Sequence, residues 1–195
     1  MTATGQSAAP PPEGFLFYVV GAPLAGKHRL LSEARHELAG DHGVIFAHRY
    51  VTRAVSADRN DEIELAEAEF LARLRRRLFA MHWERGGTHY GIGMEINYWL
   101  ALGLRVVVEG SRAYLPQALA AYPDMTVVWL GTGIAQSELA PPRSLLELRP
   151  SHKDACARAG RPRSGSPVIY LDCNGAPPGA RAGLISVLTA GPVRP

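Results

Sequence analysis

Five runs of apolar, β-branched and aromatic residues recur along this chain of 195 residues. The first run, GFLFYVV at 14–20, is continuous rather than alternating, which is typical of a strand buried on both faces of a parallel sheet. Four similar runs follow, namely VIFAHRYVT at 44–52, RVVVEGS at 105–111, TVVWLGT at 126–132 and PVIYLDCNG at 167–175. The pattern therefore predicts five strands.

Segments of helical periodicity separate these runs. After the first run, Leu30, Leu31, Ala34 and Leu38 fall at helical spacing, and Gly40 can end that helix. Further helical patterns cover 64–80, 94–103, 115–122 and 180–190. Because strands and helices alternate, the sequence predicts an α/β fold with a five-stranded, mostly parallel sheet flanked by helices.

Two segments do not fit this alternation. Residues 1–13 contain three prolines among small and polar residues, which predicts a flexible tail. Residues 133–166 contain four prolines and six lysines or arginines, which indicates a mobile insert rather than core. We expect the range 14–191 to form a single domain.

The composition narrows the classes of function. A hydrophobic fraction of 47% with 20% charged residues is typical of a globular protein, and a net charge of +3 suits a small anionic ligand without requiring nucleic acid. No apolar run approaches the ~20 residues that a membrane span needs. The two cysteines, Cys156 and Cys173, form no CxxC motif, so we expect a reduced, cytoplasmic protein. The oligomeric state stays open, and a homodimer is one option.

A glycine-rich loop joins the first predicted strand to the first predicted helix. The stretch YVVGAPLAGKHRLL at 18–31 contains the pattern G-x-x-x-x-G-K in the context that a phosphate-binding loop requires. Glycines let the backbone N–H groups turn toward a phosphate, the helix N-terminus favours the anion, and the lysine adds a charge near the β- and γ-phosphates. The predicted ATP-binding residues are Gly21, Ala22, Pro23, Leu24, Ala25, Gly26, Lys27 and His28.

His28 stands where such a loop normally has a serine or threonine that ligates Mg²⁺. An imidazole is a poor direct ligand for Mg²⁺, which prefers hard oxygens. Three interpretations stay open: Mg²⁺ is held through water and by a carboxylate elsewhere, His28 contacts a phosphate directly, or the site binds nucleotide weakly and does no chemistry. A first-turn histidine that only faces solvent is the simplest alternative.

The order of the remaining motifs resembles the guanylate-kinase-like branch of the P-loop kinases. After the loop helix come HRYVTR at 48–53, an EF pair at 69–70, MHWERGGTHYGIG at 81–93 and VVVEGSR at 106–112. The order is still more similar to that of the ribose 1,5-bisphosphate phosphokinases of bacterial phosphonate breakdown. The resemblance covers about 15–132 well.

This resemblance implies a P-loop kinase fold with an acceptor-binding region at about 48–93 and a lid at about 133–166. It also implies a reaction, in which ATP with Mg²⁺ phosphorylates ribose 1,5-bisphosphate to 5-phosphoribosyl 1-diphosphate (PRPP). Because the accepting phosphate oxygen is already ionised near neutral pH, catalysis needs positioning and charge neutralisation rather than a strong base. Prolines interrupt the expected lid helix, whose candidate phosphate clamps are Arg143, Arg149, Arg158 and Arg161.

Three residues of the acceptor-binding region are candidate substrate contacts, two of them because they match residues of the resembled family. Arg53 matches the arginine of the TR segment that grips the acceptor phosphate, and a guanidinium can bind phosphate oxygens bidentately. Arg49, four residues earlier in a strand-like stretch, faces the same side by the period of two. Tyr90 matches the tyrosine of the YG segment, whose hydroxyl would reach the same phosphate.

Three further residues lie at the end of the strand at 105–111. Ligands of open α/β sheets collect at the carboxyl edge of the strands, where Glu109 lies. In guanylate kinases an acidic residue at this place faces acceptor and metal, so the resemblance implies this role for Glu109. As the predicted metal ligand, Glu109 would supply the oxygen that His28 does not. Ser111 and Arg112 follow as candidate substrate contacts. The predicted catalytic residues are Lys27, Arg53 and Glu109.

Two departures leave the acceptor open. In HYGIG a glycine stands where guanylate kinases commonly have a hydroxyl, which favours a sugar phosphate over a purine acceptor. The stretch DRNDEIEL at 58–65 lacks the glycine–acid–histidine cluster that ribose kinases often show. The alternatives are a guanylate or other nucleoside-monophosphate kinase, and a non-catalytic binding module that keeps this fold.

Overall fold

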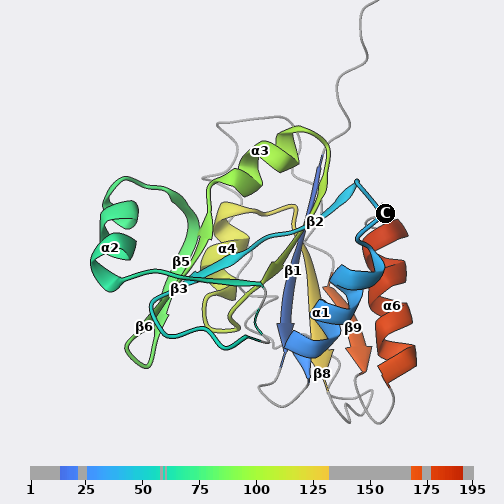
Figure 1. Cartoon of the computed structure of the whole chain (residues 1–195). Helices are drawn as coiled ribbons and strands as arrows, with labels where there is room; N and C mark the ends of the chain where they lie inside the picture. Colours follow the sequence, from blue (N-terminus) through green and yellow to red (C-terminus); the bar gives the residue numbers. More distant parts are fainter. Residues whose placement is uncertain are drawn as a thin grey trace, which may run out of the picture.

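A five-stranded parallel sheet forms the centre of the computed structural model (Figure 1). Its strands stand in the order β2-β7-β1-β8-β9, and every neighbouring pair is parallel. The strands are β1 (Phe15–Gly21), β2 (Val44–Phe46), β7 (Arg105–Glu109), β8 (Thr126–Gly131) and β9 (Val168–Asp172). The structure describes residues 14–21, 26–57, 59, 61–131, 168–172 and 177–190. The predicted α/β class with a five-stranded parallel sheet is confirmed.

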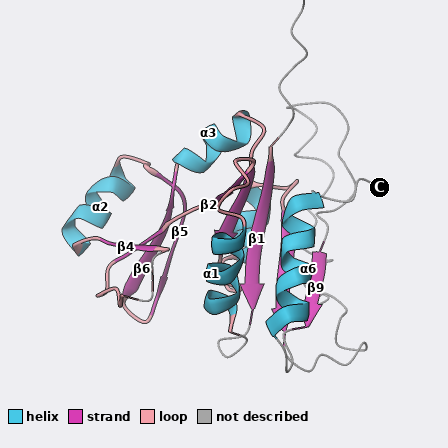
Figure 2. Ribbon diagram, turned by 45° about the vertical axis from the view of Figure 1, so that its right-hand side comes forward, coloured by secondary structure: helices cyan, strands magenta, loops and turns pink. Residues whose placement is uncertain are grey.

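Helices cover both faces of this sheet. On one face lie α1 (Lys27–Glu37) and α6 (Pro177–Ala190), which Figure 2 shows together in front of the strands. On the other face lie α3 (Glu95–Ala101) and α4 (Leu115–Ala121).

The side chains of β1 alternate between the two layers because successive residues of a strand point to opposite faces. Phe17 and Val19 pack into the core with α1 and α6, whereas Leu16, Tyr18 and Val20 pack into the core with α3 and α4. All five are buried, as the continuous apolar run predicts.

A second, four-stranded sheet projects from the first, with strand order β4-β3-β6-β5. Figure 1 shows this sheet and α2 to the left of the central sheet. Its elements are β3 (Arg49–Val51), β4 (Glu62–Glu64), α2 (Glu67–Arg75), β5 (Phe79–Arg85) and β6 (Thr88–Gly93). Met81 and Ile92 pack into the same core as Leu16 and Val106, so the small sheet is anchored on the central one. It lies within the range predicted for acceptor binding.

Several element predictions are wrong in detail. The run at 44–52 is not one strand, because β2 joins the central sheet and β3 joins the small one. The helix predicted at 64–80 ends at Arg75, since Arg77 takes a left-handed φ of 57° and β5 starts at Phe79. The first helix ends at Glu37, before Gly40. The antiparallel hairpin of β5 and β6 was not predicted.

Some predictions fall outside the described residues. These are the tail at 1–13, the lid at 133–166 with its four candidate arginines, and both cysteines. In the part of the chain that the structure describes, no helix combines the length and the apolar character needed to cross a membrane.

Candidate active site

The glycine loop connects β1 to α1, as predicted. The local backbone explains why two of its positions are glycine. Gly26 precedes α1 with a φ of 62°, a left-handed conformation that favours glycine. At Gly21, which ends β1, a Cβ atom would come within 2.8 Å of the carbonyl oxygen of Leu130. Residues 22–25 of the predicted ATP-binding loop lie outside the described part of the chain.

Lys27, the first residue of α1, points to the carboxyl end of β7. Its Nζ atom lies 3.1 Å from Oε1 of Glu109 and donates a hydrogen bond to the carbonyl oxygen of Gly110 at 3.4 Å. Since β7 is the direct neighbour of β1 in the sheet, the fold itself brings the loop lysine to this carboxylate. Two of the predicted catalytic residues therefore meet at the sheet edge where ligands of this fold class collect.

Glu109 lies between two cations. Its Oε1 atom faces Lys27 and also the Nη1 atom of Arg49 at 3.4 Å, and its side chain is only 10% exposed. Burial alone would raise the pKa of Glu109, but the charges of Arg49 and Lys27 outweigh it and hold this pKa below its ordinary value. Glu109 is therefore a carboxylate at neutral pH.

A second carboxylate, that of Glu62, forms ion pairs with three arginines. Arg49 and Glu62 stand opposite each other in the register of β3 and β4, and they form an ion pair. The Nη2 atom of Arg53 lies 2.6 Å from Oε2 of Glu62, and Nη1 of Arg59 lies 3.5 Å from Oε1. The Glu62 side chain is fully buried. Arg49 and Arg53 thus both face Glu62, although β3 ends at Val51 and Arg53 lies beyond the strand.

Tyr90 lies beside these arginines. It faces Val51 across the antiparallel pair of β3 and β6, and the Arg49 guanidinium sits 5.5 Å from its ring centroid. Burial would lower the pKa of Arg53, but the hydrogen-bonding influence of Tyr90 and the charge of Glu62 raise it. Lys27, Arg49, Arg53, Tyr90 and Glu109 are therefore brought together in one region.

The turn after β7 is fixed by Tyr18, which the sequence analysis did not single out. The Tyr18 hydroxyl donates to the carbonyl oxygen of Ser111 and accepts from the N–H of Ser111, both at 3.0 Å. A Cβ atom at Gly110 would lie 2.0 Å from the Tyr18 ring, so this position requires glycine. The sequence signal for this role of Tyr18 is a hydroxyl group inside an otherwise apolar strand.

Arg112, a predicted substrate contact, is exposed. Within the described residues its side chain forms no ion pair or hydrogen bond with Lys27, Arg49, Arg53, Tyr90 or Glu109.

Replacing Tyr18 with phenylalanine should lower the free energy of unfolding by about 1–3 kcal/mol, because two backbone groups of Ser111 lose their partner. Burial raises the pKa of Tyr18 above the ordinary 10.0. The hydroxyl therefore contributes stability that is fully present below pH 10 and is lost as the pH rises further. Urea unfolding at pH 7 and at pH 11 checks both effects, and the difference between wild type and variant should shrink at pH 11.

The control is Tyr98→Phe, since Tyr98 is 67% exposed on α3. Equal stabilities of the Tyr18→Phe variant and the wild type at pH 7 would contradict the assigned role.

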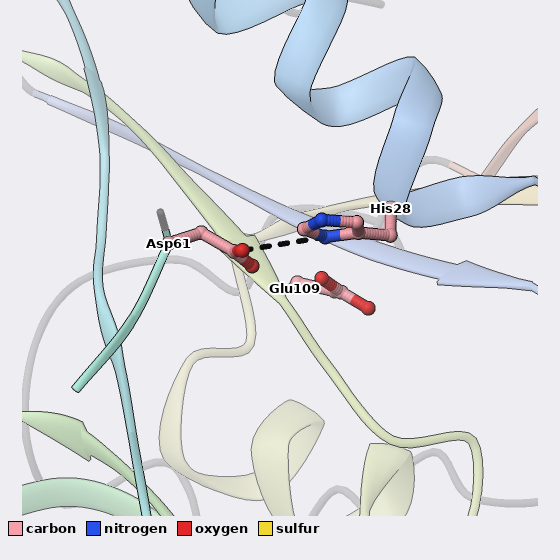
Figure 3. Close-up of side chains that lie close together, drawn as sticks. All are labelled: His28, Asp61 and Glu109. Carbon is pink, nitrogen blue, oxygen red and sulfur yellow. Dashed lines mark ion pairs between the residues drawn. The ribbon is translucent and has the colours of Figure 1, made fainter. Parts of the chain in front are cut away.

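His28 faces two carboxylates (Figure 3). Its Nδ1 atom lies 3.3 Å from Oδ1 of Asp61, and one ligand atom each from His28, Asp61 and Glu109 lie within 4.8 Å of one another. The oxygens of Asp61 and Glu109 are of the kind that Mg²⁺ prefers, so these residues fit a divalent cation next to the phosphate-binding loop. Asp61 and Glu62 were not predicted, although the departure of 58–65 from the family pattern was a signal.

Comparison with known proteins places this geometry in context. No protein-family model matches the chain. The structure superposes on that of guanylate kinase from Anaplasma phagocytophilum with a TM-score of 0.62 and 14% sequence identity. The superposition covers 92% of this chain and 87% of that one. The chain has a guanylate-kinase-like fold. The P-loop kinase fold expected from the motifs is thereby confirmed.

The sequence itself is similar to curated ribose 1,5-bisphosphate phosphokinases PhnN. The protein of Thiobacillus denitrificans is 53% identical over 116 residues, which are 60% of this chain and 61% of that protein. That of Desulfomicrobium baculatum is 49% identical over 113 residues, or 58% and 60% of the two chains. The chain thus spans about three fifths of the length of these relatives. The resemblance stated from the motifs is confirmed as sequence similarity.

Proposed function

We propose that the protein transfers the γ-phosphoryl group of ATP to the 1-phosphate of ribose 1,5-bisphosphate, giving ADP and PRPP in phosphonate degradation. One observation carries the proposal: the loop lysine Lys27 and the arginines Arg49 and Arg53 converge on two adjacent carboxylates, Glu109 and Glu62. A donor phosphate and an acceptor phosphate bound by these cations would be neighbours. The similarity to proteins named for this reaction supports the choice of acceptor.

The chemistry requires few groups. The bond between the γ-phosphorus and the bridging oxygen of ATP breaks, ADP leaves, and an ionised oxygen of the 1-phosphate forms the new bond. Lys27 neutralises charge on the transferred group, while Arg49, Arg53 and Tyr90 hold the acceptor phosphates. When bound, Mg²⁺ would supply positive charge to neutralise the phosphate oxygens. Asp61 and Glu109 are the oxygen donors nearest to the loop that would hold it.

In this scheme Glu62 and Glu109 preorganise the cationic side chains that bind phosphate. Long cationic side chains lose rotamer entropy when they are fixed, and the two carboxylates already fix Lys27, Arg49 and Arg53 before a ligand arrives. The site is therefore preorganised for anions. We place the reaction in the cytoplasm, with ATP and a sugar phosphate as its only small-molecule partners, in a monomer or a homodimer.

An acceptor panel tests the proposal. Purified protein is incubated with ATP and Mg²⁺ and with ribose 1,5-bisphosphate, GMP or dGMP, and both ADP release and the phosphorylated product are measured. Formation of PRPP is expected with the sugar bisphosphate alone. Product from GMP would instead assign a nucleoside-monophosphate kinase. The absence of any product, together with feeble binding of an ATP analogue in calorimetry, would assign a non-catalytic module.

The Arg53→Met variant should raise the KM for ribose 1,5-bisphosphate by about 10- to 100-fold, because one charge-assisted contact to phosphate is lost. The KM for ATP should stay unchanged, since in this scheme Arg53 binds the acceptor and Lys27 binds ATP. Steady-state kinetics with each substrate varied in turn checks the split. Arg85→Met, an exposed arginine on β5 of the same small sheet, is the matched control. A rise confined to the KM for ATP would overturn the assignment of Arg53 to the acceptor.

A further inference from the structure

We infer that His28, Asp61 and Glu109 bind one divalent ion of the first transition row, such as Mn²⁺, Co²⁺ or Zn²⁺, in preference to Mg²⁺ and without nucleotide. The three side chains come from the first turn of α1, the residue before β4 and the end of β7 (Figure 3). This inference does not depend on the phosphate acceptor, because it concerns only groups of the protein.

The distances fit a shared ion. Metal bonds to nitrogen and oxygen donors are about 2.0–2.2 Å long, so two donors on one ion lie about 3.0–4.2 Å apart. The 3.3 Å between Nδ1 of His28 and Oδ1 of Asp61 falls in this range, and it is longer than the usual 2.7–2.9 Å of a charge-assisted hydrogen bond. All three ligand atoms lie within 4.8 Å of one another, so a small side-chain movement completes the site.

The carboxylate oxygens supply a second, independent observation. Oε1 of Glu109 is occupied by Lys27 and Arg49, whereas Oε2 is buried and, within the described residues, accepts no hydrogen bond. Oδ1 of Asp61 is likewise buried without a hydrogen bond. A buried carboxylate oxygen that lacks a donor is costly, and a cation would satisfy both oxygens at once.

The protein backbone holds these groups in place. The carbonyl oxygen of Asp61 accepts a hydrogen bond from the N–H of Arg49 at 2.8 Å, which ties the residue to β3. Glu109 ends a strand of the central sheet, and His28 lies in the first turn of α1. A small hollow of about 30 Å³ borders the carboxylates and is lined among others by Asp61, Glu109, Ser32 and Arg35.

The donor set determines the preference for metal. One imidazole nitrogen with two carboxylate oxygens suits transition-metal ions, whose affinity for nitrogen ligands rises along the row, whereas Mg²⁺ demands oxygen ligands. The nearby charges of Lys27 and Arg49 oppose any cation on Glu109. Without nucleotide there are no phosphate oxygens to add ligands for Mg²⁺, so the bond to the histidine nitrogen supplies affinity that Mg²⁺ lacks in the free protein. His28 therefore changes which metal the loop accepts.

Cobalt is the sharpest probe, because its visible absorption reports directly on its ligands. The full chain, purified without a histidine tag and without nucleotide, is titrated with Co²⁺ and then challenged with a 100-fold excess of Mg²⁺. We expect one equivalent of Co²⁺ to bind and to be retained. The His28→Ser and Asp61→Asn variants should bind it at least about tenfold more weakly. His36→Ser, on the exposed side of α1, should bind like the wild type.

Three results would overturn the site: Co²⁺ binding that is unchanged in both ligand variants, displacement of Co²⁺ by Mg²⁺ at equal concentration, or loss of binding in His36→Ser. Circular dichroism of each variant shows whether it is folded, and Asp61→Asn keeps the test valid where His28→Ser fails to fold. Since no ATP or acceptor is present, a negative result would leave the kinase proposal standing.

Discussion

Replacing Lys27 with methionine is expected to lower kcat/KM for phosphoryl transfer by a factor of about 10²–10³, which is the usual effect of removing one preorganised group that stabilises transition-state charge. Methionine has nearly the length of lysine but no charge, so the first turn of α1 keeps its packing. The Nζ atom of Lys27 is held 3.1 Å from Glu109 and hydrogen bonds Gly110, so the charge occupies a defined position. Steady-state PRPP formation measures the loss.

The matched control is Arg29→Met, which removes one positive charge two residues later on the same helix. Arg29 is 75% exposed, and among the described residues its ion-pair partner is Glu33 on the next turn. Its replacement should change kcat/KM by less than about twofold, since surface ion pairs contribute little. A Lys27→Met enzyme within threefold of wild type would show that the phosphoryl group lies elsewhere, and the glycine loop would then not be the donor site.

The glycine loop and its lysine could be predicted because the residues that identify them are close together in the sequence. Gly21, Gly26 and Lys27 lie within one strand–loop–helix unit, whose pattern specifies both the elements and their chemistry. Glu109 follows from a second general property, since the carboxyl ends of neighbouring parallel strands meet at one edge of the sheet. The contact between Lys27 and Glu109 therefore needed only two correctly predicted strands and the assumption that they pair.

The acceptor side shows where prediction from the sequence ends. The segment 44–52 contains no glycine or proline, so no turn residue marks the change from the central sheet to the small one at Ala47 and His48. The partners of Asp61 and Glu62 depend on this change, because β4 pairs with β3 only after β3 has left the central sheet. The stretch 58–65 stands out only because it lacks an expected glycine–acid–histidine cluster, and the contacts of its acidic pair with His28 and Arg49 arise from tertiary packing.

Replacing Glu62 with glutamine should lower the free energy of unfolding by about 3–5 kcal/mol, the usual cost of breaking a buried ion pair from one side. Its carboxylate is fully buried and faces Arg49, Arg53 and Arg59. Arg49 is itself only 10% exposed, so its charge would stay in the interior with Glu109, 3.4 Å away, as its remaining carboxylate partner. Urea unfolding at pH 7 measures the loss. Glu84→Gln, an exposed glutamate on β5 of the same sheet, should change the stability by less than about 0.5 kcal/mol.

A double variant identifies the cause of this loss. If the loss of the Arg49–Glu62 pair is responsible, the Arg49→Met/Glu62→Gln protein should be more stable than the sum of the two single changes predicts, by about 1–3 kcal/mol of coupling. Strict additivity would mean that Glu62 does not stabilise the sheet through its ion pair with Arg49. The proposal that Glu62 holds the two arginines in place for a phosphate would then lose its support from Arg49. Coupling in the expected direction would instead tie the stability of the small sheet to its capacity to bind an anion.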